Sequence, residues 1–180
     1  MRILANESLG LIIDIQEKLY PFIKDNEQIT RNTAILIEGL KAIGVNIMVT
    51  EQYPKGLGFT IEPLKQLVSD IPVIEKTAFS CCDDQLFSKE FSKHQIKNVI
   101  IAGIETHVCV LQTTIDLLKQ GYQPVVIEDC VGSRSLNDKA LAIERMRQEG
   151  AIISTYESIL FELLRFSGTD VFKKISKLVK

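Results

Sequence analysis

The chain has 180 residues, of which 46% are hydrophobic and 24% are charged, and its net charge at neutral pH is −2. This length and balance predict a single domain over residues 1–180 with one sizeable core. The weak net charge gives no indication of a nucleic-acid or anionic-membrane partner, and the absence of a run of about 18 apolar residues argues against a transmembrane span.

Six short apolar segments alternate with helical patterns and are expected to form strands. Three of them follow a glycine, Gly44, Gly121 or Gly150, where the preceding helix is expected to end, because glycine tolerates the left-handed conformation there. Nearly continuous apolar strands between helices are typical of a parallel sheet covered on both faces. A final amphipathic helix is expected over residues 171–179. The expected strands lie near residues 9–14, 45–50, 72–75, 98–102, 124–128 and 151–154.

Chemically reactive side chains stand at three of the predicted strand ends. Asp14 ends the first strand, Lys76 follows the third, and Cys109 lies shortly after the fourth, where a helix is expected to begin. Ligands of open parallel sheets bind beyond the carboxyl ends of the strands, at the point where the strand order reverses. If the first strand lies at that point, the third strand is about 10 Å away, a gap that a lysine side chain can largely cross.

A thiol, a carboxylate and an ammonium together form a coherent set for covalent catalysis. Only the thiolate is a strong nucleophile, so we expect the ammonium of Lys76 and the start of the helix to lower the pKa of Cys109. The carboxylate of Asp14 can accept the thiol proton and return it to a leaving group. Backbone N–H groups at the helix start are suited to an oxyanion.

The other cysteines do not suggest a disulfide framework. The four cysteines, at positions 81, 82, 109 and 130, show no CxxC spacing, and adjacent Cys81 and Cys82 would close only a strained ring. The N-terminus turns polar too early for a secretory signal. We therefore expect a reduced, cytoplasmic protein.

With these residues in place, the chain resembles the isochorismatase-like cysteine hydrolases, a superfamily that also holds nicotinamidases and N-carbamoylsarcosine amidases. The resemblance runs from Gly10 to the C-terminal helix. Its most specific part is Gly103-Ile104-Glu105-Thr106-His107-Val108-Cys109-Val110, supported by Asp14-Ile15-Gln16 and by residues 75–80. Within the superfamily the chain is most similar to the isochorismatase domain-containing proteins, which have a stretch like residues 50–58.

The resemblance implies an α/β fold with three α/β/α layers and a six-stranded, mostly parallel sheet of strand order 3-2-1-4-5-6. It implies that Cys109 is the nucleophile, Asp14 the general base and acid, and Lys76 the charge that tunes both. It also implies a non-proline cis peptide between Ile104 and Glu105, which would turn the N–H groups of Glu105 and Cys109 toward the oxyanion. A homo-oligomer that uses no cofactor is implied as well.

The substrate pocket and a metal site are less clearly indicated. Gln16, Tyr53, Phe79 and His107 are candidates for the pocket wall, and each is equally well explained by structural packing. The chain has only two histidines, His94 and His107, so the two-histidine metal site of nicotinamidases is not expected.

We therefore expect a hydrolase that acts on a small molecule through a thioester-like intermediate. Its target is an amide or related C–N bond, or a vinyl ether of the isochorismate type. One alternative is a Cys–His pair of Cys109 with His107, although only one residue separates them. Two further alternatives are a thiol redox protein that uses Cys109, for which the sequence offers no obvious resolving cysteine nearby, and a non-catalytic binding or scaffold protein.

Overall fold

The computed structural model describes residues 2–180 and contains one six-stranded sheet, in which every pair of neighbouring strands is parallel. The strand order is β3-β2-β1-β4-β5-β6, as the resemblance implied. The order reverses at β1, which lies between β2 and β4. The strands are β1 (Ser8–Ile13), β2 (Asn46–Gln52), β3 (Val73–Lys76), β4 (Asn98–Ile104), β5 (Gln123–Gly132) and β6 (Ile152–Ser154).

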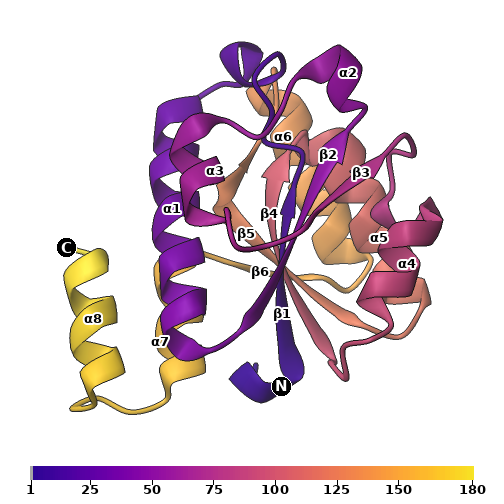
Figure 1. The fold of residues 1–180 in the computed structure, drawn as a ribbon. Helices are drawn as coiled ribbons and strands as arrows, with labels where there is room; N and C mark the ends of the chain where they lie inside the picture. Colours follow the sequence, from indigo (N-terminus) through magenta and orange to yellow (C-terminus); the bar gives the residue numbers. More distant parts are fainter. Residues whose placement is uncertain (1) are drawn as a thin grey trace.

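Helices cover both faces of the sheet, which confirms the predicted three-layer architecture (Figure 1). One face carries α1 (Asn26–Ile43), α3 (Glu62–Leu67), α7 (Tyr156–Leu164) and α8 (Asp170–Leu178). The other carries α4 (Gln85–Phe91), α5 (Leu111–Lys119) and α6 (Leu136–Gln148). The short helix α2 (Pro54–Leu57) follows the carboxyl end of β2.

The central strands are apolar on both sides because each helical layer buries alternate residues. All six residues of β1 are buried. Leu11 and Ile13 belong to the core beneath α4 and α5, whereas Ile12 belongs to the core beneath α1 and α7. This alternation follows from the two-residue period of a strand, and burying the strand on both faces holds its carboxyl end in a fixed position.

The helix ends and the last helix agree with the sequence pattern. Gly44, Gly121 and Gly150 all have positive φ angles, of 86°, 86° and 110°, and each stands two residues before the start of β2, β5 or β6. Helix α8 buries Ile175 against the body of the protein. Neither α8 nor any other helix within residues 2–180 is long and apolar enough to cross a membrane.

The observed strands differ from the predicted ones mainly at their carboxyl ends. The first strand ends at Ile13, because Asp14 adopts a left-handed conformation with φ of 52°. Strand β5 was expected to end near residue 128 but continues to Gly132. The polar pair Glu128-Asp129 coincides with an irregular register between β4 and β5, after which Val131 pairs with Gly103. The second half of β5 was therefore not predicted, because two polar residues interrupt its apolar pattern.

Candidate active site

Strand register brings the carboxyl ends of β1, β2 and β3 together. Ile13, the last residue of β1, is paired with Thr50 on one side and with Gly103 on the other. Lys76, the last residue of β3, is paired with Gln52 of β2. The residue that follows Ile13 is Asp14, and aspartate tolerates the left-handed conformation that it adopts there better than most residues do. Asp14 thus lies at the edge of the sheet where the strand order reverses.

Asp14 and Lys76 form an ion pair that is completely buried. Lys76 Nζ donates to Asp14 Oδ2 at 2.6 Å, and neither side chain is exposed to solvent. Thr50 Oγ1 donates to the other carboxylate oxygen, Asp14 Oδ1, at 2.7 Å. Both oxygens of the carboxylate therefore have a donor from the protein.

The Lys76 ammonium is fixed by further acceptors. Besides Asp14, it donates to Gln52 Oε1 at 2.9 Å, to the carbonyl oxygen of Ala78 at 3.1 Å and to that of Phe79 at 3.3 Å. Burial lowers the pKa of Lys76, but the charge and hydrogen bond of Asp14, together with the two nearby thiols of Cys81 and Cys109, hold that pKa above its ordinary value. Lys76 is therefore a permanent positive charge in a fixed position.

Cys109 lies in the turn of π-helix Thr106–Val110 that leads into α5, and only 6% of its surface is exposed. Burial raises the pKa of the Cys109 thiol well above its ordinary value, the charge of Asp14 raises it further, and the charge of Lys76 lowers it. The expected lowering of this pKa is thus wrong for the resting protein, because burial beside an ionised carboxylate outweighs the lysine.

Asp14 acts on the Cys109 thiol through its charge and through a hydrogen bond, so its carboxylate is placed where it can accept the thiol proton. While Asp14 is ionised, its charge opposes a second negative charge on Cys109. Moving the proton from the sulfur to Asp14 removes that opposition and leaves a single negative charge beside Lys76. The arrangement therefore permits a thiolate to form by internal proton transfer.

The peptide bond between Ile104 and Glu105 is cis, as the resemblance implied. The carbonyl oxygen of Glu105 accepts from the amides of Val108 and Val110, at 3.1 and 3.3 Å. These two amides are therefore already occupied. The Glu105 carboxylate accepts from Arg134 Nε at 2.8 Å, which ties the start of the turn to the loop after β5.

The four candidate pocket residues occupy different positions. Gln16 is fully buried and bridges loops: its Nε2 donates to the carbonyl oxygens of Gln52 and Gly58, and its Oε1 accepts from the Gln52 amide. The side chain of Tyr53 is exposed and lines a cavity with Lys76, and that of Phe79 is exposed as well.

His107 points toward the loop after β5. Its Nδ1 lies 3.0 Å from Ser133 Oγ, and it lines a cavity of about 180 Å³ with side chains of α5 and α6. A hydroxyl, rather than a carboxylate, thus faces its ring nitrogen. This arrangement gives the alternative Cys–His pair no orienting acid at that nitrogen.

Three residues close to the ion pair escaped the sequence reasoning: Thr50, Gln52 and Cys81. Thr50 and Gln52 are ordinary strand residues by composition. The only available signal was their position at the end of β2, next to the strand that carries Asp14. Cys81 Sγ donates to Thr50 Oγ1 at 4.0 Å, so this second thiol belongs to the same buried group.

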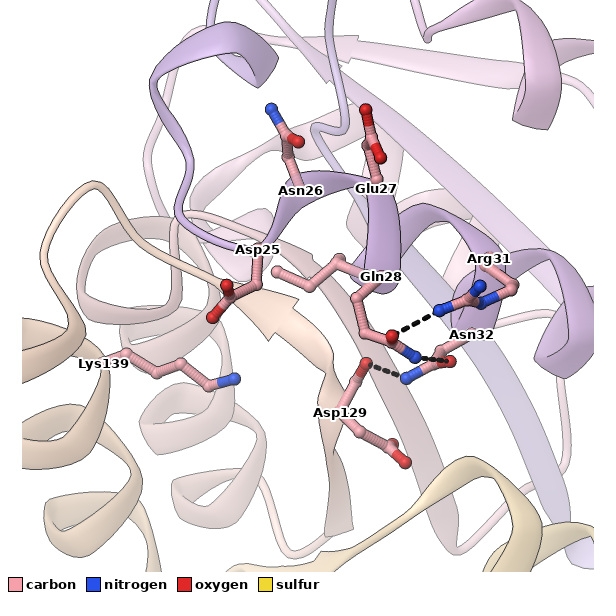
Figure 2. Close-up of a pocket in the computed structure, with 9 residues that line it drawn as sticks. Asp25, Asn26, Glu27, Gln28, Arg31, Asn32, Asp129 and Lys139 are labelled. Carbon is pink, nitrogen blue, oxygen red and sulfur yellow. Dashed lines mark hydrogen bonds between the residues drawn. The ribbon is translucent and has the colours of Figure 1, made fainter.

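A cavity of about 550 Å³ lies apart from these residues (Figure 2). It is formed by the start of α1, by Asp129 of β5 and by Lys139 of α6. Its amide side chains are occupied among themselves, since Gln28 donates to Asn32, which donates to the Asp129 carbonyl oxygen. None of the candidate site residues lines it. Within residues 2–180, no three His, Cys, Asp or Glu side chains are grouped as a metal site.

Comparison with known proteins identifies relatives whose matched region includes the candidate site residues. The family model of the isochorismatase domain matches residues 8–158. Isochorismatase domain-containing protein 2A of Mus musculus is 38% identical over 180 residues, which span 99% of this chain and 85% of that protein. The structure of MAR1 ribonuclease from Caenorhabditis elegans is 39% identical, with a TM-score of 0.93 over 99% of this chain and 92% of that one. YcaC from Escherichia coli, described as an octameric hydrolase of unknown specificity, is 24% identical and shares the fold, with a TM-score of 0.92 over 98% of this chain and 90% of that one.

Proposed function

Because this chain belongs to the isochorismatase family and has the fold of its hydrolases, we propose that it is a cofactor-independent hydrolase of a small molecule, with Cys109, Asp14 and Lys76 as its catalytic residues. The observation that carries the proposal is the buried Lys76–Asp14 pair, whose two charges act on the thiol of Cys109. Buried titratable groups that perturb one another at a strand-end site are typical of catalytic centres.

The reaction follows from these positions. Asp14 takes the proton of Cys109, and the sulfur attacks an electrophilic carbon, most simply an amide carbonyl. The amides of Glu105 and Cys109 receive the negative charge that develops on the carbonyl oxygen. Asp14 then protonates the leaving amine, and a water molecule activated by the same carboxylate releases the thioester-like intermediate. A vinyl ether of the isochorismate type would use Asp14 as the acid.

The surroundings of Glu105 suggest what the substrate resembles. A cavity of about 330 Å³ is lined by Lys18, Leu19, Phe22, Glu105 and Arg134, and the Arg134 guanidinium is paired with the Glu105 carboxylate. Lys18 adds a basic group that this pair does not use, and together with the two apolar side chains it suits a small acidic molecule with an apolar body. RNA is the second substrate to test, because the Caenorhabditis elegans relative is described as a ribonuclease, but the net charge of −2 does not favour a polyanion.

The test is a substrate panel of amides, carbamoyl compounds, isochorismate-type vinyl ethers and RNA. We expect the wild type to hydrolyse a member of the small-molecule set and Cys109→Ala to lose at least about a thousandfold in turnover. Cys82→Ala is the matched control. It also removes one thiol, but Cys82 is only half-buried and is not one of the proposed catalytic residues. Mass spectrometry after rapid quenching is expected to find the adduct on Cys109. An adduct on another residue, or unchanged turnover by Cys109→Ala, would refute the proposal.

We also propose that the protein is a cytoplasmic homo-oligomer. All four cysteines are free thiols, which a reducing compartment preserves. Large apolar side chains near the carboxyl edge are more than half exposed, among them Phe22, Tyr53 and Phe59. A second copy of the chain would bury such side chains, and the Escherichia coli relative is described as octameric. Light scattering of the purified protein measures the number of copies.

A further inference from the structure

A second thiol shares the buried centre with Cys109. Cys81 is fully buried and lies in the 3₁₀ turn Cys81–Asp83, shortly after Lys76. Its sulfur donates to Thr50 Oγ1 at 4.0 Å, and Thr50 Oγ1 in turn donates to Asp14 Oδ1 at 2.7 Å. The Cys81 thiol is therefore connected to the Asp14 carboxylate through one hydroxyl group.

The backbone of Cys81 is also attached to the helix that carries Cys109. The amide of Cys81 donates to Thr113 Oγ1 at 3.0 Å. Thr113 stands four residues after Cys109, about one turn further along the same helical segment. Both cysteines belong to the same apolar cluster beneath α4 and α5. The backbone of Cys81 is thus attached by one hydrogen bond to a residue one helical turn beyond Cys109, and Cys81 is close enough to act on the ionisation of the Cys109 thiol.

We propose that Cys81 is a resolving cysteine, which condenses with Cys109 after a hydroperoxide has oxidised Cys109 to a sulfenic acid. The resulting disulfide blocks Cys109 reversibly and protects it from irreversible oxidation. The proposal rests on the reactive Cys109 of the proposed function, but it requires no hydrolytic substrate. It also supplies the resolving thiol that the sequence alone did not reveal.

The steps balance with one hydroperoxide. Cys109 passes its proton to Asp14, and its sulfur attacks the peroxide, breaking the O–O bond. The departing oxygen takes the proton from Asp14 and leaves as water, or as an alcohol. Cys81 then passes its proton through Thr50 to Asp14, and its sulfur attacks the Cys109 sulfur. The S–O bond breaks, and the hydroxide leaves as water with that proton. Two thiols are oxidised to one disulfide, and the peroxide is reduced.

The position of Cys81 explains why it, rather than its neighbours, would resolve the sulfenic acid. Cys82 is half-buried, and its amide donates to Ser80 Oγ within its own turn. Cys130 belongs to the apolar cluster on the opposite face of the sheet. Cys82 only packs against the cluster that holds Cys109, whereas Cys81 is buried within that cluster and is hydrogen-bonded to Thr50.

The experiment counts thiols in the full chain after treatment with equimolar hydrogen peroxide. The wild type is expected to lose two of its four free thiols and to yield a Cys81–Cys109 linked peptide, and dithiothreitol is expected to restore both thiols. Cys81→Ala is expected to lose only the Cys109 thiol, as a sulfenic acid that dimedone captures and that further peroxide oxidises irreversibly. Cys81→Ser, which nearly preserves the side-chain volume, serves if the alanine variant does not fold.

Cys82→Ala is the matched control and is expected to behave as the wild type. The proposal is overturned by over-oxidation of wild-type Cys109 without a disulfide, by a linked pair other than Cys81–Cys109, or by loss of two thiols in Cys81→Ala. These readouts are independent of hydrolysis. A protein without a substrate can still form the disulfide, and a working hydrolase can fail to form it.

Discussion

Asp14 is central to the proposed site, because its carboxylate interacts with the Lys76 ammonium, the Thr50 hydroxyl and the Cys109 thiol. Lys76 and Thr50 donate to its two oxygens, and its charge raises the pKa of Cys109. In the proposed reaction this carboxylate both affects the ionisation of the Cys109 thiol and accepts its proton. Removing its charge while keeping its shape separates the two roles.

Asp14→Asn is therefore expected to have opposite effects on ionisation and on turnover. Without the carboxylate charge, the pKa of Cys109 falls, because Lys76 still favours the thiolate and the opposing charge is gone. Alkylation of Cys109 by iodoacetamide at neutral pH is expected to become at least about tenfold faster. Hydrolysis is expected to be lost, because no group accepts and returns the proton.

The pH dependence of alkylation and the ultraviolet absorbance of the thiolate measure this effect. Asp14→Asn combined with Cys109→Ala is the control, since it measures the contribution of the remaining thiols, among them Cys81, whose pKa the charge of Asp14 also raises. An unchanged or higher pKa of Cys109 in Asp14→Asn would show that the carboxylate does not act on the thiol as described.

At this scale the sequence predicted which side chains come together but not their electrostatic balance. Asp14, Lys76 and Cys109 were identifiable because strand-end residues in a parallel sheet share one edge. Thr50 could not be identified in the same way, since a threonine in an apolar strand is unremarkable without the left-handed turn at Asp14 that brings the carboxylate to it. The sign of the pKa change at Cys109 depends on burial, which no short motif reveals.

Among the elements, the contact between β1 and β4 determines how closely the turn that carries Cys109 approaches Asp14. Gly103 has a φ of 145°, and a Cβ atom there would lie 2.3 Å from the carbonyl oxygen of Ile13. No side chain can be accommodated without moving the backbone of one strand. The glycine at which the apolar run stops thus permits the two strand ends to lie against each other.

Gly103→Ala is expected to lower the free energy of unfolding by about 2 kcal/mol or more, because it combines a positive φ with a backbone clash. Gly121→Ala is the matched control: its φ is also positive, at 86°, but nothing lies within 4 Å of the added carbon. It is expected to cost only about 1 kcal/mol. Denaturant titration of both variants measures the difference. Equal losses would contradict the role assigned to the close approach.

Element boundaries were predictable where the chain is punctuated by glycine and less so where polar residues continue a strand. Gly44, Gly121 and Gly150 correctly marked three helix ends. The second half of β5 was missed, because its pairing with β4 resumes only after the irregular register at residues 101–103. The π-helical form of Thr106–Val110 could not be predicted either, because the sequence features that mark the start of a helix do not distinguish a π-helix from an α-helix.

For the molecule as a whole, the buried thiols determine how stability responds to alkaline pH. Burial raises the pKa of Cys81 to about 12 from an ordinary 9.0, and it raises that of Cys130 as well. The folded state therefore holds these protons more tightly than the unfolded chain. The stabilisation is complete below pH 9 and is lost progressively as the pH rises from 9 toward 12.

The free energy of unfolding is thus expected to be nearly constant between pH 7 and about pH 8.5 and to fall above pH 9. Cys130→Ala is expected to be less stable at neutral pH, because a buried side chain is truncated, but to show a shallower alkaline decline, because one titrating thiol is gone. Denaturant titrations across this range measure both slopes. The same decline in both proteins would mean that burial of Cys130 does not contribute to it.

The burial of the Lys76–Asp14 pair also affects how the protein responds to its medium. The pair and the neutral thiol have no net charge together, and a proton passed from sulfur to carboxylate leaves that sum unchanged. Dissolved ions screen charges over about 8 Å at physiological ionic strength, and they screen buried charges much less than exposed ones. A change in salt concentration therefore screens the exposed charges, which give the molecule its net charge of −2. It has little effect on the electrostatic environment of the buried proton transfer.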